Sequence, residues 1–198
     1  MTSSVFIPVR GPPFEASTKV KCSDGWMVIQ KMYSGSSSYR YKRWHDYTTG
    51  FGYHFRSMWF GNKHLHELTG LHRYKLLIYV QKKDKVWVKV AEYENFYIEN
   101  ERHKFRLHVD NFKKVSTDAV DSFNDAENHL GNYQNGQPFS TMDKDNDNKW
   151  THCSVGLHRK AGWWFNGCGS YLNGYEGTHW GNHYDIVASK MLIAPHDD

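Results

Sequence analysis

Three aspartates, Asp143, Asp145 and Asp147, occupy alternate positions in the segment STMDKDNDNKWTHC, residues 140–153. Carboxylates at this spacing repel one another unless a positive charge lies among them. In a loop the usual cation is Ca²⁺, which binds oxygen ligands from carboxylates, carbonyls and water. A solvated acidic turn is the alternative, and the spacing alone leaves both interpretations open.

The spacing does not fit an EF-hand. A loop of that kind that began at Asp143 would need a glycine where the sequence has Asn148. It would also need a bidentate glutamate where the sequence has Ser154. Two carboxylates with carbonyl and water oxygens would still make a reasonable calcium shell.

The chain has three cysteines. Cys153 and Cys168 flank a stretch rich in aromatic residues and glycine, and could close a short loop. Cys22 would then have no partner in the chain, and an odd cysteine suggests an intermolecular bond or a free thiol. The first residues show no basic region followed by an apolar region, so they do not read as a signal peptide.

Sequence motifs of enzymes are missing. There is no GxSxG, no HExxH and no phosphate-binding Walker loop, so we expect no catalytic activity. His64 and His66 form an HxH pair, but no third zinc ligand is near them in sequence. The net charge is +4 and the basic residues are scattered, which argues against a nucleic-acid partner. No apolar run is long enough to be inserted into a membrane.

The elements that must position these residues are mainly strands. Alternation of apolar and polar side chains predicts strands at 25–31, 74–81, 86–93 and 105–109. Residues 62–70 read as a short helical turn. A length of 198 residues predicts one domain, and 16% aromatic residues can supply its core.

Residues 111–163 are rich in Asp, Asn, Gly and Ser, which favour turns. A long segment with little periodicity is uncommon inside a compact domain. Aromatic residues recur in it, so we interpret it as packed loops rather than disorder. A metal ion and a disulfide are the usual devices that hold such loops.

Six blocks of sequence resemble one known family. They are DGWMVIQKMYSGS (24–36), RWHDYTTGFG (43–52), MWFGNKHLHELT (58–69), QNGQPFSTMDKDND (134–147), AGWWFNGCGSYLNGY (161–175) and YDIVASKMLIAP (184–195). In this order they resemble the fibrinogen C-terminal (fibrinogen-related) domain. Each block alone is a weak signal, but six in order along nearly the whole chain are a strong one.

The resemblance implies an α+β fold, with a central antiparallel sheet, short helices and a loop-rich subdomain that binds calcium and a ligand. It also implies a secreted, extracellular protein. The family has a further cysteine upstream of the one matched by Cys22. We therefore expect residues 1–198 to be a single domain of this type, truncated at its N-terminus.

The resemblance assigns roles around residues 140–153. It implies a disulfide between Cys153 and Cys168, with Cys22 bonded to neither. It implies a Ca²⁺ site that lies in the loop before Cys153. The calcium ligands would be the side chains of Asp145 and Asp147 and the backbone carbonyls of Lys149 and Thr151.

The leading functional hypothesis is a lectin, similar to the ficolins and tachylectins. Such a domain would bind acetylated sugars or related glycans in innate immunity. The residues that would form the ligand site are Leu157, His158, Gly167, Cys168, Tyr175, His179 and Trp180. We expect one of Trp163 and Trp164 to be core and the other to reach the pocket wall, because successive side chains alternate along a strand.

Two departures from the family pattern favour an alternative. Gly169 stands where the family often has histidine, and the loop 175–184 is shorter than in many members. Both changes weaken a sugar pocket. The alternative is a protein–protein interaction domain that binds a peptide or a cell-surface receptor. In either case oligomers would form through segments that this chain does not contain.

Overall fold

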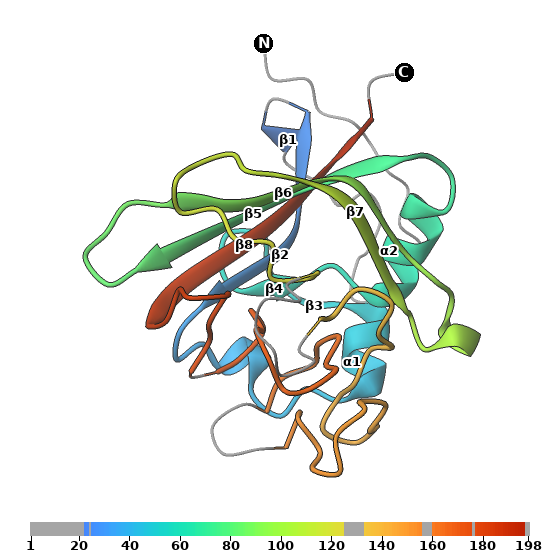
Figure 1. Ribbon diagram of the computed structural model, residues 1–198. Coiled ribbons are helices and arrows are strands. Elements are labelled where there is room, and N and C mark those ends of the chain that lie inside the picture. Colours follow the sequence, from blue (N-terminus) through green and yellow to red (C-terminus); the bar gives the residue numbers. More distant parts are fainter. Residues whose placement is uncertain (1–21, 24, 125–132, 156–159, 176, 197–198) are drawn as a thin grey trace.

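The computed structural model describes residues 22–23, 25–124, 133–155, 160–175 and 177–196 (Figure 1). A single antiparallel sheet forms its centre, in the order β3-β4-β2-β8-β5-β6-β7, with β1 paired to β2. The strands are β1 (Cys22–Ser23), β2 (Trp26–Tyr33), β3 (Phe51–Gly52), β4 (Met58–Trp59), β5 (Tyr74–Lys82), β6 (Val88–Ile98), β7 (Leu107–Lys113) and β8 (Ile186–Pro195). The helices are α1 (Trp44–Thr49) and α2 (Asn62–Thr69), with short 3₁₀ turns η1 (Ser37–Tyr39) and η2 (Glu101–His103). The predicted α+β class is confirmed.

The strands arise where apolar residues alternate. The predicted strands at 25–31 and 74–81 correspond to β2 and β5, and the helical turn at 62–70 corresponds to α2. Gly70 closes α2, since its amide donates to the carbonyl of His66 at 2.9 Å. No helix in the described part of the chain is long and apolar enough to cross a membrane.

β8 lies in the middle of the sheet, between β2 and β5 (Figure 1). Its residue Met191 pairs with Gln30 on one side and Ile78 on the other. Ser189 of the same strand accepts a hydrogen bond from the buried Gln30 amide at 2.9 Å. The final strand therefore joins the two halves of the sheet.

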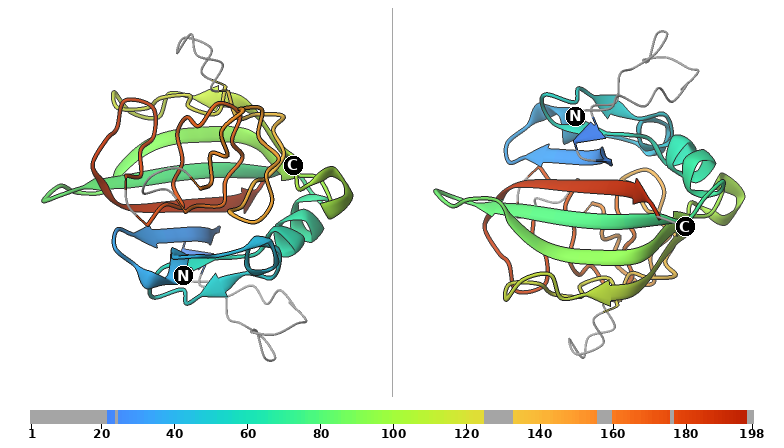
Figure 2. Two further views of the ribbon diagram at one scale, coloured as in Figure 1. Left: turned by 90° about the horizontal axis from the view of Figure 1, so that it is seen from below. Right: turned by 90° about the horizontal axis from the view of Figure 1, so that it is seen from above.

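The described parts of the segment between β7 and β8 gather on one side of the sheet. Figure 2 shows these loops covering that face, and Figure 1 places α1 beside them. In the described parts of 111–163 beyond β7, the chain forms turns and isolated bridges such as Ser140–Trp163. The expectation of packed loops is confirmed in those parts.

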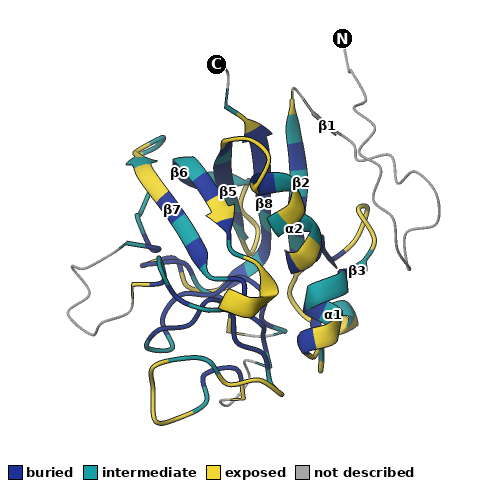
Figure 3. Cartoon of the chain, turned by 90° about the vertical axis from the view of Figure 1, so that its right-hand side faces the viewer, coloured by how far each residue is buried: buried dark blue, intermediate teal, exposed yellow. Residues whose placement is uncertain are grey.

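An aromatic core lies between the sheet and the loops. Figure 3 shows buried residues both along the strands and in the loop segments. Phe139 lies within the core, and its ring centre is 5.2 Å from that of Tyr47, 5.9 Å from Trp59 and 5.1 Å from Trp164. All four side chains are fully buried. Helix α1, strand β4 and two loop segments thus share one core.

The expectation that one of Trp163 and Trp164 reaches a pocket wall is wrong. Both indoles are fully buried. Trp163 Nε1 donates to the side chain of Gln134 at 2.7 Å, and Trp164 Nε1 donates to the carbonyl of Phe105 at 2.8 Å. The two rings do face different surroundings, but protein covers both sides, because this segment is sandwiched between the sheet and other loops.

Candidate calcium and ligand-binding site

Asn146 anchors the loop at residues 140–153 to the residues where the loop begins. Its side-chain amide donates to the carbonyl of Phe139 at 2.8 Å, and its backbone amide donates to Ser140 Oγ at 3.0 Å. Since Phe139 is part of the aromatic core, the loop starts from a rigid base. The aspartates on either side of Asn146 are thereby held in defined positions.

Asp143 contacts helix α1, unlike Asp145 and Asp147. Its Oδ1 accepts hydrogen bonds from the backbone amide of Trp44 at 2.9 Å and from the Thr141 hydroxyl at 2.8 Å. Desolvation opposes its ionisation, but these hydrogen bonds outweigh it and hold the pKa of Asp143 below its usual value. Trp44 is the first residue of α1, so Asp143 caps that helix from a distant part of the chain.

Asp143→Ala is therefore expected to destabilise the fold by about 1 kcal/mol, which is typical for loss of a helix cap. It should weaken calcium binding far less than Asp145→Ala does. Urea unfolding gives the first quantity and calcium titration calorimetry the second. If Asp143→Ala weakens calcium binding as much as Asp145→Ala, the carboxylate of Asp143 is a ligand and not a cap.

Asp147 organises the second half of the loop. Its two carboxylate oxygens accept hydrogen bonds from the amides of Lys149 and Cys153, both at 2.9 Å. Burial raises the pKa of Asp147 and the nearby Asp145 carboxylate raises it further, although the amide hydrogen bonds oppose this rise. Two carboxylates that disfavour each other's charge leave a place where a cation would be stabilised.

The oxygens around Asp145 and Asp147 fit a hard cation. In the described part of the chain, the carbonyls of Lys149 and Thr151 accept no hydrogen bond, so both oxygens remain available. No cluster of three His, Cys, Asp or Glu side chains that could hold a metal occurs among the described residues. A metal here would thus need carbonyl and water oxygens as well as the two carboxylates, which suits Ca²⁺ better than Zn²⁺.

A disulfide joins Cys153 and Cys168, whose Cα atoms are 5.1 Å apart. The disulfide that the resemblance implied is thus present in the structure. Because the two cysteines bond to each other, neither is available to Cys22. The side chain of Cys22 lies outside the described residues.

Hydrogen bonds connect the loop at 140–153 to the segment before Cys168. The Asn148 side-chain amide donates to Asn166 Oδ1 and to Gln137 Oε1, both at 2.8 Å, and the Asn148 backbone amide donates to the Asn166 carbonyl at 3.3 Å. Cys168 itself has a left-handed backbone, with φ of 59°. This conformation is uncommon outside glycine, so the surrounding structure must hold it in place.

The structure separates the residues expected to bind a ligand. Gly167, Cys168, Tyr175 and His179 are half-buried. Trp180 is fully buried; its ring packs edge-on against Phe123 at 4.8 Å, and its Nε1 donates to the carbonyl of Val120 at 3.1 Å. It therefore presents no ring to a ligand. Leu157 and His158 lie outside the described residues.

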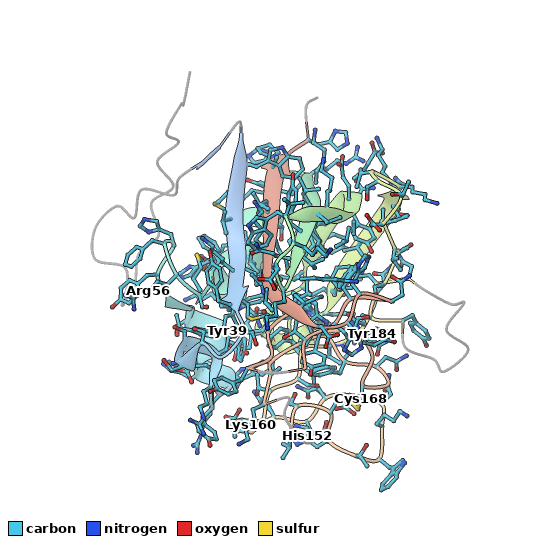
Figure 4. All side chains as sticks on the ribbon, turned by 90° about the vertical axis from the view of Figure 1, so that its left-hand side faces the viewer. Tyr39, Arg56, His152, Lys160, Cys168 and Tyr184 are labelled. Atoms are coloured by element: carbon cyan, nitrogen blue, oxygen red, sulfur yellow. A yellow bond between two sulfur atoms is a disulfide. The ribbon has the colours of Figure 1, made fainter. Side chains whose placement is uncertain are left out.

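Sequence reasoning missed two residues beside this surface. Tyr184 is 61% exposed, and its ring stacks on that of His179 at 5.5 Å. The guanidinium of Arg40 lies 5.4 Å from the ring centre of Tyr175. Tyr184 stood inside a family block and could have been chosen as an aromatic before the final strand. Figure 4 shows Tyr184 and Cys168 at the same end of the molecule, beyond the sheet.

A cavity of about 480 Å³ lies elsewhere, between the start of β5 and the strands β6 and β7. Its lining includes the stacked pair Tyr97 and His108, and Arg73, which donates to Asn95 at 2.7 Å. None of its lining residues belongs to the loop at 140–153 or to the disulfide region. It is therefore separate from the candidate site.

Comparisons with known proteins identify the family of the chain. The family model described as "Fibrinogen beta and gamma chains, C-terminal globular domain" matches residues 9–190. The chain is 35% identical to Techylectin-5A of Tachypleus tridentatus, over 86% of this chain and 60% of that protein. It is 34% identical to Angiopoietin-2 of Mus musculus, over 87% of this chain and 35% of that protein. It thus spans less than two thirds of either relative.

Two solved structures share the fold. The fibrinogen-like globe domain of human ANGPTL2 superimposes with a TM-score of 0.79 at 28% identity, covering 99% of this chain and 94% of that one. The lamprey fibrin D-dimer, complexed with the peptide ligand Gly-His-Arg-Pro-amide, superimposes with a TM-score of 0.74 at 26% identity, covering 87% of this chain and 62% of that one.

Proposed function

Because the chain belongs to the family of fibrinogen C-terminal globular domains, which are recognition domains, we propose that it is a secreted, calcium-stabilised lectin. Its ligands would be acetylated sugars or related glycans, as in innate-immune recognition. The similarity to a relative named as a lectin supports this choice. The carrying observation is the set of hydrogen bonds that links the candidate calcium loop to Cys153 and to Asn166, two residues before Cys168.

In this proposal Ca²⁺ is held by the side chains of Asp145 and Asp147 and the carbonyls of Lys149 and Thr151. The ion supplies positive charge that offsets the repulsion between the two carboxylates. Asp147 also accepts a hydrogen bond from the Cys153 amide at 2.9 Å. The calcium loop therefore positions the disulfide without any contact between the ion and the sugar.

The hydrogen bonds of Asn148 to Asn166 would likewise hold the segment that leads to the other half-cystine, Cys168. Beyond it, the ligand surface would consist of Gly167, Cys168, Tyr175 and His179, together with the exposed ring of Tyr184. Acetyl recognition requires a small apolar hollow, aromatic walls and a backbone donor for the carbonyl oxygen. The partly exposed aromatic rings could form the walls, and the backbone amides of Gly167 and Cys168 could supply the donor.

We expect a weak interaction with a single sugar, with Kd of about 1 mM, because Trp180 is buried and adds no wall. The test is an NMR titration of labelled protein with N-acetylglucosamine, with calcium and with a chelator. Shifts should appear near Cys168 with calcium and disappear with the chelator. If no shifts appear there at sugar concentrations of tens of millimolar, roughly ten times that Kd or more, the lectin proposal fails.

The alternative is a domain that binds a peptide or a cell-surface receptor. The specific observation in its favour is Trp150, which lies in the candidate calcium loop and is 94% exposed. Exposed tryptophans are enriched among the residues that anchor protein interfaces. The lamprey fibrin structure, which holds a peptide ligand, supports it as well. A receptor bound through Trp150, with no response to sugars, would favour this alternative.

A further inference from the structure

A second surface borders the proposed ligand site and has a different chemistry. We call it the basic face, and it consists of Arg40, Tyr41, Arg43, Lys144 and Lys160. Arg40, Tyr41, Arg43 and Lys144 are exposed, and Lys160 is half-buried. These residues come from three segments that are far apart in the sequence. Figure 4 shows Lys160 at the same end of the molecule as Cys168.

Tyr41 is the centre of the basic face. The Lys160 ammonium lies 4.5 Å from the ring centre of Tyr41 and 3.3 Å from its hydroxyl oxygen, to which it donates. The Arg40 guanidinium lies 4.9 Å from the same ring centre. Two cations from different segments are thus held at one exposed ring.

Arg43 and Lys144 extend the basic face toward α1. Arg43 directly precedes Trp44, and the Lys144 ammonium lies 4.1 Å from the Trp44 ring centre. Asp143 lies beside them, and its Oδ1 accepts hydrogen bonds from the Trp44 amide and the Thr141 hydroxyl. A second carboxylate is also near, since Trp44 Nε1 donates to Glu101 Oε1 at 2.7 Å. Arg43 and Lys144 therefore lie beside acidic groups, and the positive charge of the basic face is concentrated at Arg40 and Lys160.

Arg40 and Lys160, the two cations at Tyr41, form no ion pair with a described carboxylate, whereas Arg43 helps to lower the pKa of the neighbouring Asp143. Among the described residues, none of Arg40, Arg43, Lys144 and Lys160 forms a salt bridge, whereas the neighbouring Lys42 lies 3.6 Å from Asp46. The Lys160 ammonium at the hydroxyl lowers the pKa of Tyr41, and Arg40 lowers it further. Both observations indicate a positive potential around Tyr41, where no described carboxylate pairs with Arg40 or Lys160.

The backbone of Tyr41 is strained, with φ of 59°. A bulky aromatic residue in the left-handed region is a genuine outlier, and such residues concentrate at ligand-binding sites. Here the unusual backbone holds the ring between Arg40 and Lys160. Tyr41 is thus a positioning residue for the two cations.

We propose that the basic face binds the sulfate groups of a sulfated polysaccharide. Guanidinium groups bind sulfate and carboxylate through paired hydrogen bonds, and ammonium groups add point charges. Arg40 also lies over Tyr175, which belongs to the proposed sugar surface. An anion held at Arg40 would therefore adjoin a sugar ring at Tyr175. The choice of a polysaccharide over an acidic protein rests on the proposed function for this reason.

The test uses immobilised chondroitin sulfate and surface plasmon resonance over a series of salt concentrations. Arg40→Gln/Lys160→Gln should weaken binding about tenfold and flatten the salt dependence, by roughly one unit of slope for each cation removed. Lys83→Gln/Lys85→Gln is the matched control. It removes the same charge from exposed positions in the β5–β6 turn and should leave binding nearly unchanged.

Tyr41→Gly supplies a second variant in case the double variant does not fold. Glycine adopts the left-handed backbone without strain, so the fold should persist while the two cations are no longer held at a ring. This variant should also weaken binding to chondroitin sulfate. A melting curve for each variant distinguishes impaired binding from impaired folding.

Three results would overturn the proposal: no binding to chondroitin sulfate, equal weakening in the Arg40/Lys160 variant and the Lys83/Lys85 control, or equally tight binding of unsulfated chondroitin or polyglutamate. These results are independent of the N-acetylglucosamine titration. Binding of chondroitin sulfate without a response to the acetylated sugar would contradict the lectin proposal alone. The reverse result would contradict the basic face alone.

Discussion

Chelation of calcium is expected to lower the melting temperature of the chain, and Asp147→Asn is expected to abolish that effect. A ligand that binds only the folded state stabilises it by about 3 kcal/mol at one hundred times its Kd. For a chain of this size that corresponds to roughly 6–12 °C in melting temperature. The effect should be large because Asp145 and Asp147 repel each other when no cation is bound.

The measurement is differential scanning calorimetry of the protein with calcium and with a chelator. Asp147→Asn keeps the shape of the side chain but removes its charge, and it keeps only one of the two hydrogen bonds that the carboxylate accepts. Asp145→Ala should abolish the calcium effect as well. Asp143→Asn is the matched control and should retain it, since Asp143 faces Trp44. Equal melting temperatures of the unmodified chain with calcium and with chelator would rule out the calcium site.

Removal of the disulfide is expected to destabilise the fold by about 3 kcal/mol. Cys153 and Cys168 are 15 residues apart, and a loop of this size contributes about that amount when the disulfide restricts the unfolded chain. The variant Cys153→Ala/Cys168→Ala avoids a buried hydroxyl at position 153. Urea unfolding measures the change, and an unaltered free energy of unfolding would contradict the prediction.

Cys22→Ala provides the control for the disulfide variant. The peptide that contains Cys153 and Cys168 should appear intact in mass spectrometry without reduction, whether or not Cys22 is present. The free energy of unfolding should change little. A peptide in which Cys22 is joined to Cys153 would overturn the assignment.

The alternation of apolar residues predicted β2, β5, β6 and β7, four of the eight strands in the described part of the chain, but not their ends. The predicted strand at 86–93 continues as β6 to Ile98, because Phe96 and Ile98 pair with Val109 and Leu107 of β7. Phe105 was expected to begin a strand, yet its φ is 50° and β7 begins two residues later. Strand ends depend on partners elsewhere in the sheet, which a local pattern does not reveal.

The site was predictable where the residues are close in sequence. The disulfide lies where the resemblance placed it, and the assignment of calcium to Asp145 and Asp147 stays a prediction. The helix-capping role of Asp143 was not predictable, because its partner Trp44 is 99 residues away. The proximity of Arg40 to Tyr175 could not be predicted either, because these residues are also far apart in the sequence. Nothing local distinguishes a buried Trp180 from an exposed one.

The central place of β8 has a consequence for biosynthesis. The sheet is completed by interactions such as that of Gln30 with Ser189, which are 159 residues apart in the chain. While the protein is being synthesised, β2 and β5 have no partner between them, so the sheet can only close after β8 has been made. Interactions of such long range slow folding and leave strand edges open to association with other chains. The nascent chain should therefore depend on chaperones, and a stop codon before β8 should prevent folding of the whole domain.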